Sequence, residues 1–288
     1  MNKYLNIGIV ANRVNLKKVD ANNLPKIAPM DRTEEIIAKR EIREGLIQLM
    51  RGKEKPEIII VPELSTPRGF VREMKRYACK MNSIIVFGVD YLIDNVNKTV
   101  KNQIIVTIPD RWPKRNYNRK TFSLSIDKRC FPLEEKVELG KKQLVPRTDK
   151  RLWIIDAGPY GNIGIANCYD FLDVEMHLLY RNKIQHLFVL SYNMDKSSFI
   201  HTAESLCRTI FCNVIICNTG YFGGSVSIAP YDESYERVIY STEGKNLFTT
   251  QVIKIPVKDL KERQDNPDKD KGQFPHHVPG FKNLPPGF

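Results

Sequence analysis

The chain has 288 residues, of which 42% are hydrophobic and 27% charged, a mixture that excludes wholesale disorder and allows one large α/β domain or two small ones. No apolar run approaches the roughly 18 residues that span a bilayer, and the N-terminus lacks the apolar stretch of a secretory signal, so we expect a cytoplasmic protein without membrane contact. The net charge of +12 allows a nucleic-acid partner but does not favour one, because the basic residues are spread along the chain as on a solvated surface.

In the first half of the chain, short apolar runs alternate with amphipathic stretches. Residues 6–11 predict a buried strand. Apolar residues near helical spacing predict a helix that begins at Asp31, with Asp31 or Thr33 as its N-cap. Residues 57–63 predict a strand that ends in the carboxylate of Glu63, and a helix at about 67–81 is expected to follow. Further strands are expected at 83–91 and 101–109, and the segment 112–148 is interpreted as a loop.

The second half has the same alternation of elements. Strands are predicted at 152–157, 161–168, 186–192, 213–220, 223–230, 238–242 and 249–257, and helices at 174–182 and 198–212. This pattern is typical of a layered α/β fold.

The character of the chain changes after about Lys258, where the sequence becomes polar and then rich in Pro and Gly. Such a segment cannot bury a core of its own, and its composition disfavours a helix. We therefore divide the chain into a domain at 1–257 and an extended tail at 258–288. Isolated apolar residues could anchor the tail to a partner surface: Phe274, Phe281, Leu284 and Phe288.

Three residues near the ends of predicted strands could carry chemistry. Glu63 ends one predicted strand, Cys168 ends another, and Lys120 follows the strand-and-loop segment 109–119. A thiol nucleophile needs a base to remove its proton and a cation to stabilise the tetrahedral intermediate, and these residue types supply both. The six cysteines form no CxxC pair and lack histidines at zinc-finger spacing, so no metal site is expected.

Four motifs resemble those of the nitrilase superfamily. VPELS at 61–65 is similar to its glutamate motif, YNRK at 117–120 to its lysine motif, and GNIGIANCYDFLDVE at 161–175 to its cysteine motif. NVIICNTGYFGGSVSIAP at 213–230 resembles the later segment in which an Asn ends a strand before a Gly-Gly-Ser turn. The resemblance extends from about Tyr4 to Val257, with the motifs in family order.

The resemblance implies a four-layer αββα sandwich that assembles into a homodimer or a higher homo-oligomer, with the C-terminal segment packed across the subunit interface. It also implies hydrolysis of a non-peptide carbon–nitrogen bond, in an amide or N-carbamoyl substrate, through a cysteine thioester and without a cofactor.

Carried over by position, Cys168 is the nucleophile, Glu63 the general base and Lys120 the cation beside the oxyanion. The backbone N–H of Tyr169 is the second oxyanion donor, and the resemblance places Asn193 and Asn218 at the pocket. An accessory glutamate is expected at Glu135, with Glu134 as its rival.

The flanking sequences depart from the family pattern. Leu172, Asp173 and Val174 stand where a basic step is usual, and Thr121 and Phe122 follow the lysine motif in place of His-Leu. These departures leave a second hypothesis open, in which the fold serves as a catalytically weak binding or signalling module, associated with nucleic acid through its basic charge.

Overall fold

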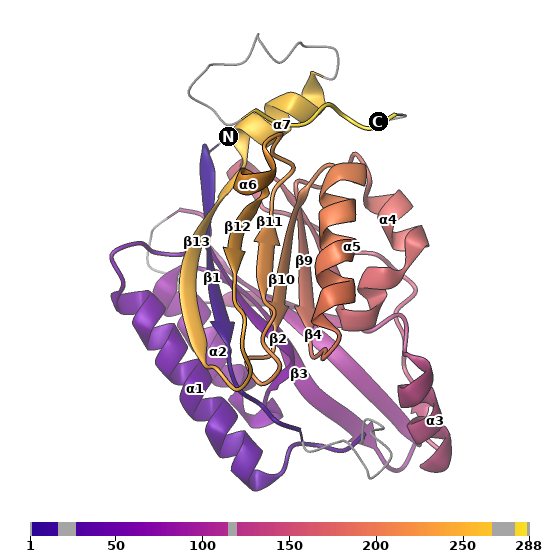
Figure 1. The fold of residues 1–288 in the computed structure, drawn as a ribbon. Helices are drawn as coiled ribbons and strands as arrows, with labels where there is room; N and C mark the ends of the chain where they lie inside the picture. Colours follow the sequence, from indigo (N-terminus) through magenta and orange to yellow (C-terminus); the bar gives the residue numbers. More distant parts are fainter. Residues whose placement is uncertain (1, 17–26, 115–119, 267–279, 287–288) are drawn as a thin grey trace.

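The computed structural model describes residues 2–16, 27–114, 120–266 and 280–286, and these residues form two β-sheets packed face to face (Figure 1). The first sheet has the order β13-β1-β2-β3-β4-β5, with β6 beside β4, and the second has the order β12-β11-β10-β9-β8-β7. The strands of the first sheet are β1 (Tyr4–Ala11), β2 (Ile58–Thr66), β3 (Ile84–Asp94), β4 (Thr99–Pro109), β5 (Thr121–Asp127), β6 (Val145–Pro146) and β13 (Thr249–Pro256). Those of the second are β7 (Ile154–Asp156), β8 (Asn162–Asn167), β9 (His186–Ser191), β10 (Asn213–Asn218), β11 (Val226–Ile228) and β12 (Val238–Ser241).

Helices cover the outer face of each sheet, which completes four layers. On the first sheet lie α1 (Arg32–Arg51) and α2 (Val71–Met81), and on the second lie α4 (Val174–Tyr180) and α5 (Lys196–Thr209) (Figure 1). The remaining helical segments are η1 (Arg68–Phe70), α3 (Leu133–Lys141), η2 (Gly158–Tyr160), η3 (Cys168–Leu172), α6 (Ser234–Arg237) and α7 (Lys258–Asp265). No helix in the described part of the chain combines the length and the apolar character that a bilayer crossing requires.

The alternation of side chains along β2 shows why its apolar run is continuous. Ile58 and Ile60 belong to the core between the sheets, whereas Ile59 and Val61 face the core beneath α1 and α2. Successive side chains of a strand point to opposite faces, so a strand that is covered on both sides must be apolar at every position. The same reasoning applies to β9, which is buried along its whole length.

The parallel strands of the two sheets have their carboxyl ends on the same side of the sandwich. The backbone is locally irregular there. We expected β2 to end at Glu63, but it continues to Thr66. Its register against β3 shifts between Val61 and Thr66, and Leu64 has a left-handed φ of 53°. Gly88 of β3 faces this bulge, and a Cβ atom there would lie 2.4 Å from the Cα of Glu63. Only glycine lets the neighbouring strand approach so closely.

Two expectations from the sequence are wrong. The segment 112–148 is not a continuous loop, because it contains β5, α3 and β6. Residues 258–265 are not extended, because they form α7, in which Leu260 is fully buried. Charged residues dominate α7, and a short helix of this kind is stabilised by packing of its few apolar residues more than by a strong periodic pattern.

The described residues 280–286, near the C-terminus, contact the body of the same chain. The ring of Phe281 stacks on Tyr231 with centroids 4.9 Å apart, and Leu284 packs against the same small cluster. The other two expected anchors, Phe274 and Phe288, lie outside the described residues.

Candidate active site

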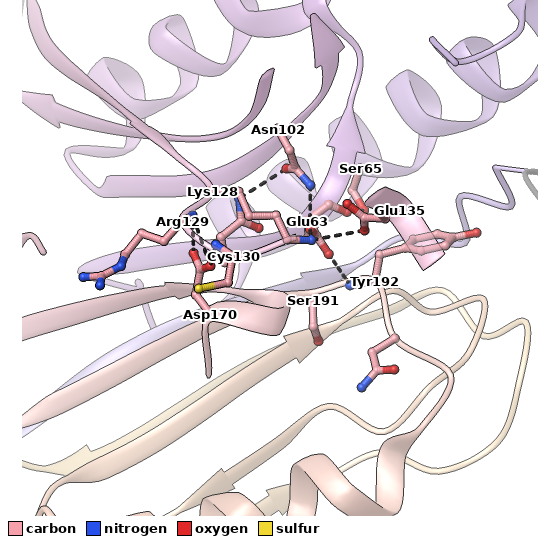
Figure 2. Close-up of polar contacts among 12 residues, drawn as sticks. Glu63, Ser65, Asn102, Lys128, Arg129, Cys130, Glu135, Asp170, Ser191 and Tyr192 are labelled. Carbon is pink, nitrogen blue, oxygen red and sulfur yellow. Dashed lines mark hydrogen bonds and ion pairs between the residues drawn. The ribbon is translucent and has the colours of Figure 1, made fainter. Parts of the chain in front are cut away.

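The carboxylate of Glu63 lies at the centre of a buried polar cluster between the two sheets (Figure 2). Its Oε1 accepts hydrogen bonds from Asn102 Nδ2 at 2.7 Å and from Lys128 Nζ at 3.0 Å. Its Oε2 accepts one from the backbone N–H of Tyr192 at 3.0 Å. A buried carboxylate with three donors keeps one orientation and can act as a base for a group that approaches its remaining lone pair.

Lys128 directly follows β5 and is fully buried. Its ammonium group bridges Glu63 and Glu135, with Nζ 3.0 Å and 3.2 Å from the respective Oε1 atoms. Burial alone would lower the pKa of Lys128, but the carboxylates of Glu135 and Glu63 outweigh this effect and raise the pKa well above its usual value. The site therefore holds a permanent buried cation.

Lys120, which the sequence assigned to this role, lies elsewhere. It is exposed and stands just before β5, and its carbonyl accepts a hydrogen bond from the backbone N–H of Asp110. Lys128 stands just beyond the other end of the same strand, and at about 3.3 Å per residue the two lysines are roughly 26 Å apart. The assignment of the cation to Lys120 is therefore wrong, because the structure brings Lys128, not Lys120, to Glu63.

Cys168 follows β8 at the first position of η3, with a left-handed φ of 50°. A non-glycine residue in this conformation is strained and is held there by its surroundings. Cys168 as a residue is partly exposed, whereas its thiol is buried and lies close enough to Glu63 for the charge of that carboxylate to act on it. Burial and the charge of Glu63 raise the pKa of Cys168 well above its usual value, with Lys128 opposing them. The resting group is therefore a neutral thiol beside the carboxylate of Glu63.

Glu135, on the first turn of α3, also lies in the cluster, whereas its rival Glu134 does not take part in it among the described contacts. Burial raises the pKa of Glu135, and Lys128 only partly offsets this effect. Its second oxygen, Oε2, is buried and has no hydrogen-bond partner among the described residues. This oxygen is an acceptor that a bound molecule could satisfy.

The predicted pocket residues divide between surface and scaffold. Tyr169 is 41% exposed and directly follows Cys168. The buried side chain of Asn218 donates to the carbonyls of Asn193 and Gly223 and accepts from Ser191 Oγ and the Asn193 N–H. Since all its hydrogen-bonding capacity serves this turn, Asn218 braces the loop that presents the N–H of Tyr192 to Glu63.

The side chain of Asn193 closes the next turn of the same loop. Its amide nitrogen donates to the carbonyl of Asp195, and its amide oxygen accepts from the N–H of Asp195. The role of Asn193 among the described contacts is therefore to shape the start of α5.

Asp170 ties the turn that begins at Cys168 to the segment that follows β5. Its carboxylate accepts the backbone N–H groups of Arg129 at 3.1 Å and of Cys130 at 2.6 Å (Figure 2). Burial raises the pKa of Asp170 to about 6, in spite of Lys128 and the two N–H donors. Its role as a brace, and not as a reacting group, follows from these backbone contacts.

Asp170 gives a pH-dependent prediction. The folded state binds the Asp170 proton more tightly than the unfolded state, whose Asp has a pKa of about 3.9. The protein therefore loses stability as the pH rises from about 4 through about 6, by about 3 kcal/mol in total. The Asn side chain of Asp170→Asn cannot titrate. The free energy of unfolding of this variant, relative to that of the unsubstituted protein, should therefore rise by this amount from acidic to neutral pH. Urea unfolding at several pH values measures the difference, and a difference that is constant with pH would contradict the prediction.

Three buried residues of the site were missed from the sequence: Lys128, Asn102 and Asn167. The signal for Lys128 is the alternation of polar and apolar residues at 121–127, which is typical of a half-buried strand, followed directly by a lysine. Asn102 and Asn167 are amides within apolar strands, where a polar residue without a local partner indicates a contact across the fold. The match of YNRK to the lysine motif concealed these signals.

Comparisons with known proteins agree with this geometry at the level of the fold. No protein-family model and no curated protein matches the sequence. Nit3 of Saccharomyces cerevisiae, a nitrilase-superfamily protein, is 13% identical, with a TM-score of 0.66 over 95% of this chain and 98% of its own. A carbon–nitrogen hydrolase from Helicobacter pylori is 11% identical, with a TM-score of 0.65 over 94% of this chain and 97% of its own.

An amidase from Nesterenkonia sp. is a further structural neighbour, at 12% identity and a TM-score of 0.61 over 92% of this chain and 95% of its own. In that mutant structure the acetamide moiety of fluoroacetamide is joined covalently to the active-site cysteine. The chain therefore has the fold of the nitrilase superfamily. The predicted four-layer αββα architecture and the resemblance that led to it are confirmed as a fold.

Proposed function

We propose that the protein is a carbon–nitrogen hydrolase that cleaves an amide or N-carbamoyl group through a thioester on Cys168. The observation that carries the proposal is the placement of the Cys168 thiol within the electrostatic reach of Glu63, whose carboxylate accepts a hydrogen bond from the buried ammonium of Lys128. These groups correspond to a nucleophile, its base and a cation for the oxyanion. Glu63 lies within β2, whereas Lys128 and Cys168 directly follow β5 and β8. A purely structural role would not require a thiol at the strained position of Cys168.

The reaction uses these groups in two halves. Cys168 Sγ attacks the carbonyl carbon while its proton passes to Glu63, and Lys128 stabilises the oxygen as it becomes negative. The backbone N–H of Tyr169 is proposed as the second donor to this oxygen. The tetrahedral intermediate then expels ammonia or an amine, which takes the proton from Glu63. Water, deprotonated by Glu63, attacks the thioester and releases the acid with the free thiol.

The free acceptor of Glu135 favours an amide over a nitrile. Oε2 of Glu135 is buried without a partner, and an amide or N-carbamoyl nitrogen carries N–H donors that could satisfy it. A nitrile carries none. Because a buried acceptor that stays unpaired costs about 1–3 kcal/mol, this oxygen contributes to the choice between the two substrate classes.

We also propose that the protein forms a homodimer or a higher homo-oligomer. Several apolar residues after Cys168 are exposed around η3 and α4, including Val174 and Leu178, each 66% exposed. Exposed apolar side chains gathered on one short segment favour a protein interface there. Light scattering of the intact protein gives the mass that decides between monomer and oligomer.

The proposed function is tested by ammonia release from primary amides and N-carbamoyl compounds, together with labelling of the protein by fluoroacetamide. We expect turnover and one adduct on Cys168, located by peptide mass spectrometry. Cys168→Ala should lose both, while Cys130→Ser, which changes a partly exposed thiol close to the site in sequence, should retain both. Ammonia release that persists in Cys168→Ala would identify another nucleophile. A Cys168 that stays unlabelled would favour the non-catalytic module.

A further inference from the structure

A pair of buried amides joins the base to the strand of the nucleophile. Asn102 Nδ2 donates to Glu63 Oε1 at 2.7 Å, and Asn102 Oδ1 accepts from Asn167 Nδ2 at 3.2 Å. Asn102 belongs to β4 in the first sheet, and Asn167 is the last residue of β8 in the second, directly before Cys168. The connection therefore crosses the core between the sheets.

Both amides are almost entirely buried, with Asn102 at 0% and Asn167 at 2% exposure, beside apolar neighbours of the core between the sheets. Burying amide groups is unfavourable unless they form hydrogen bonds. Two apolar residues of similar volume could fill this space without that cost. The amides are thus accounted for by the geometry that they impose more than by stability.

The direction of the hydrogen bonds shows what the pair imposes. An Asn side chain has a donor end and an acceptor end, and only its donor end can face a carboxylate favourably. The N–H of Asn167 fixes the acceptor end of Asn102 toward the second sheet, so that the donor end faces Glu63. The backbone carbonyl of Asn102 also accepts the N–H of Lys128 at 2.8 Å. One residue therefore contacts the base, the cation-bearing turn and the nucleophile strand.

We infer that Asn102, oriented by Asn167, is a positioning residue that sets both the direction and the basicity of Glu63. This inference rests on the proposed function. Asn102 and Lys128 occupy Oε1 of Glu63, and the remaining lone pair on Oε2 is left for the thiol of Cys168. Without Asn102, the carboxylate holds a proton more strongly and is free to turn away from the sulfur, because hydrogen bonds to the charged form of an acid favour that form.

The experiment follows the rate at which iodoacetamide alkylates Cys168 as a function of pH, read by peptide mass spectrometry. In this reaction a carbon–sulfur bond forms, iodide leaves, and the thiol proton passes to Glu63. The rate therefore falls at acidic pH, where the transfer of the thiol proton is opposed. No substrate has to be known.

Asn102→Leu is expected to move the acidic limb of this profile up by about one to two pH units, since a hydrogen bond to a charged group contributes about 1.5–3 kcal/mol. The plateau rate should also fall. Asn167→Ala, which frees the orientation of Asn102 without filling the core, should move the limb in the same direction by a smaller amount. This second variant decides the question if Asn102→Leu does not fold.

Asn213 provides a matched control. It is also fully buried and also joins the sheets, because its Nδ2 donates to the carbonyl of Pro256 in β13 at 2.8 Å. It begins β10, at the end of that strand opposite to Asn218 and the Tyr192 loop. Asn213→Leu also replaces a buried amide that joins the sheets, but it should leave the limb of the profile unmoved.

Three results would overturn the inference. One is an unshifted limb in both Asn102→Leu and Asn167→Ala, with Cys168 still reactive. Another is an equal shift in Asn213→Leu, which would show a general response to a weakened core. A native Cys168 that is not alkylated at any pH would overturn the proposed function and the inference with it, which separates that failure from the first two.

Discussion

Replacement of Lys128 by methionine is expected to lower turnover by about 10²- to 10³-fold, the usual effect of removing one group that stabilises an oxyanion. The substitution also leaves the carboxylates of Glu63 and Glu135 close together without the ammonium that joins them. Breaking a buried ion pair in this way costs about 3–5 kcal/mol. One of the two carboxylates should then take up a proton, which weakens Glu63 as a base.

The matched control is Lys120→Met, which removes the lysine that the motif indicated. Lys120 is exposed at the other end of β5, so this variant should keep native turnover and native stability. Ammonia release and urea unfolding measure both quantities. If Lys128→Met does not fold, the double variant with Glu135→Gln relieves the repulsion, and comparison with Glu135→Gln alone gives the catalytic loss due to Lys128. Full activity in Lys128→Met with loss in Lys120→Met would restore the original assignment.

Truncation after Val257 is expected to unfold most of the protein or to lower its stability severely. The deletion removes Leu260, which is fully buried, and Phe281, which is 6% exposed. Each buried apolar side chain contributes about 1.5–3 kcal/mol. The Gln264 side chain, which donates to the carbonyls of Phe211 and Ile184, is lost as well. Since total stability is about 5–15 kcal/mol, the loss takes a large share of it.

A second truncation, after Asn266, separates the two parts of the terminus. It keeps α7 and removes residues 267–288, which include Phe281. It should therefore have a smaller effect than the longer deletion. Circular dichroism and thermal melting measure the stability, and light scattering measures the mass. A fully stable domain that ends at Val257 but no longer self-associates would show that the tail serves another subunit, as the sequence indicated.

The sequence predicted those parts of the structure that repeat a simple pattern. The strands at 6–11 and 186–192 were found because they are short, continuous apolar runs, and the helix from Asp31 was found because its apolar residues recur near helical spacing. Asp31, one of two candidates, proved to be the N-cap, as its side chain accepts the N–H of Glu34. Glu63, Cys168 and Glu135 were found because they lie next to strand ends or within motifs, and the structure brings all three to Lys128 or to one another.

The parts that failed depend on contacts between distant residues. Whether a lysine is buried depends on which end of its strand meets the carboxylates, and the local sequence around Lys120 contains no information on this. The helix α7 is held by Leu260 and Gln264 against a surface that the remainder of the chain builds. Asn102 acquires its role only when β8 is brought opposite β4, 65 residues away in sequence from its partner Asn167.

The division of the site between two sheets gives the apolar core a second significance. Glu63 and Lys128 are carried by the first sheet, and Cys168 and Tyr192 follow strands of the second. The distance between the Glu63 carboxylate and the Cys168 sulfur is therefore set by the thickness of the apolar layer that separates the two sheets. Protein interiors are close-packed and transmit strain, so a methylene group added far from the cysteine changes this distance without touching a reacting atom. Substitutions in the core between the sheets therefore have to be tested for their effect on the candidate site as well as on stability.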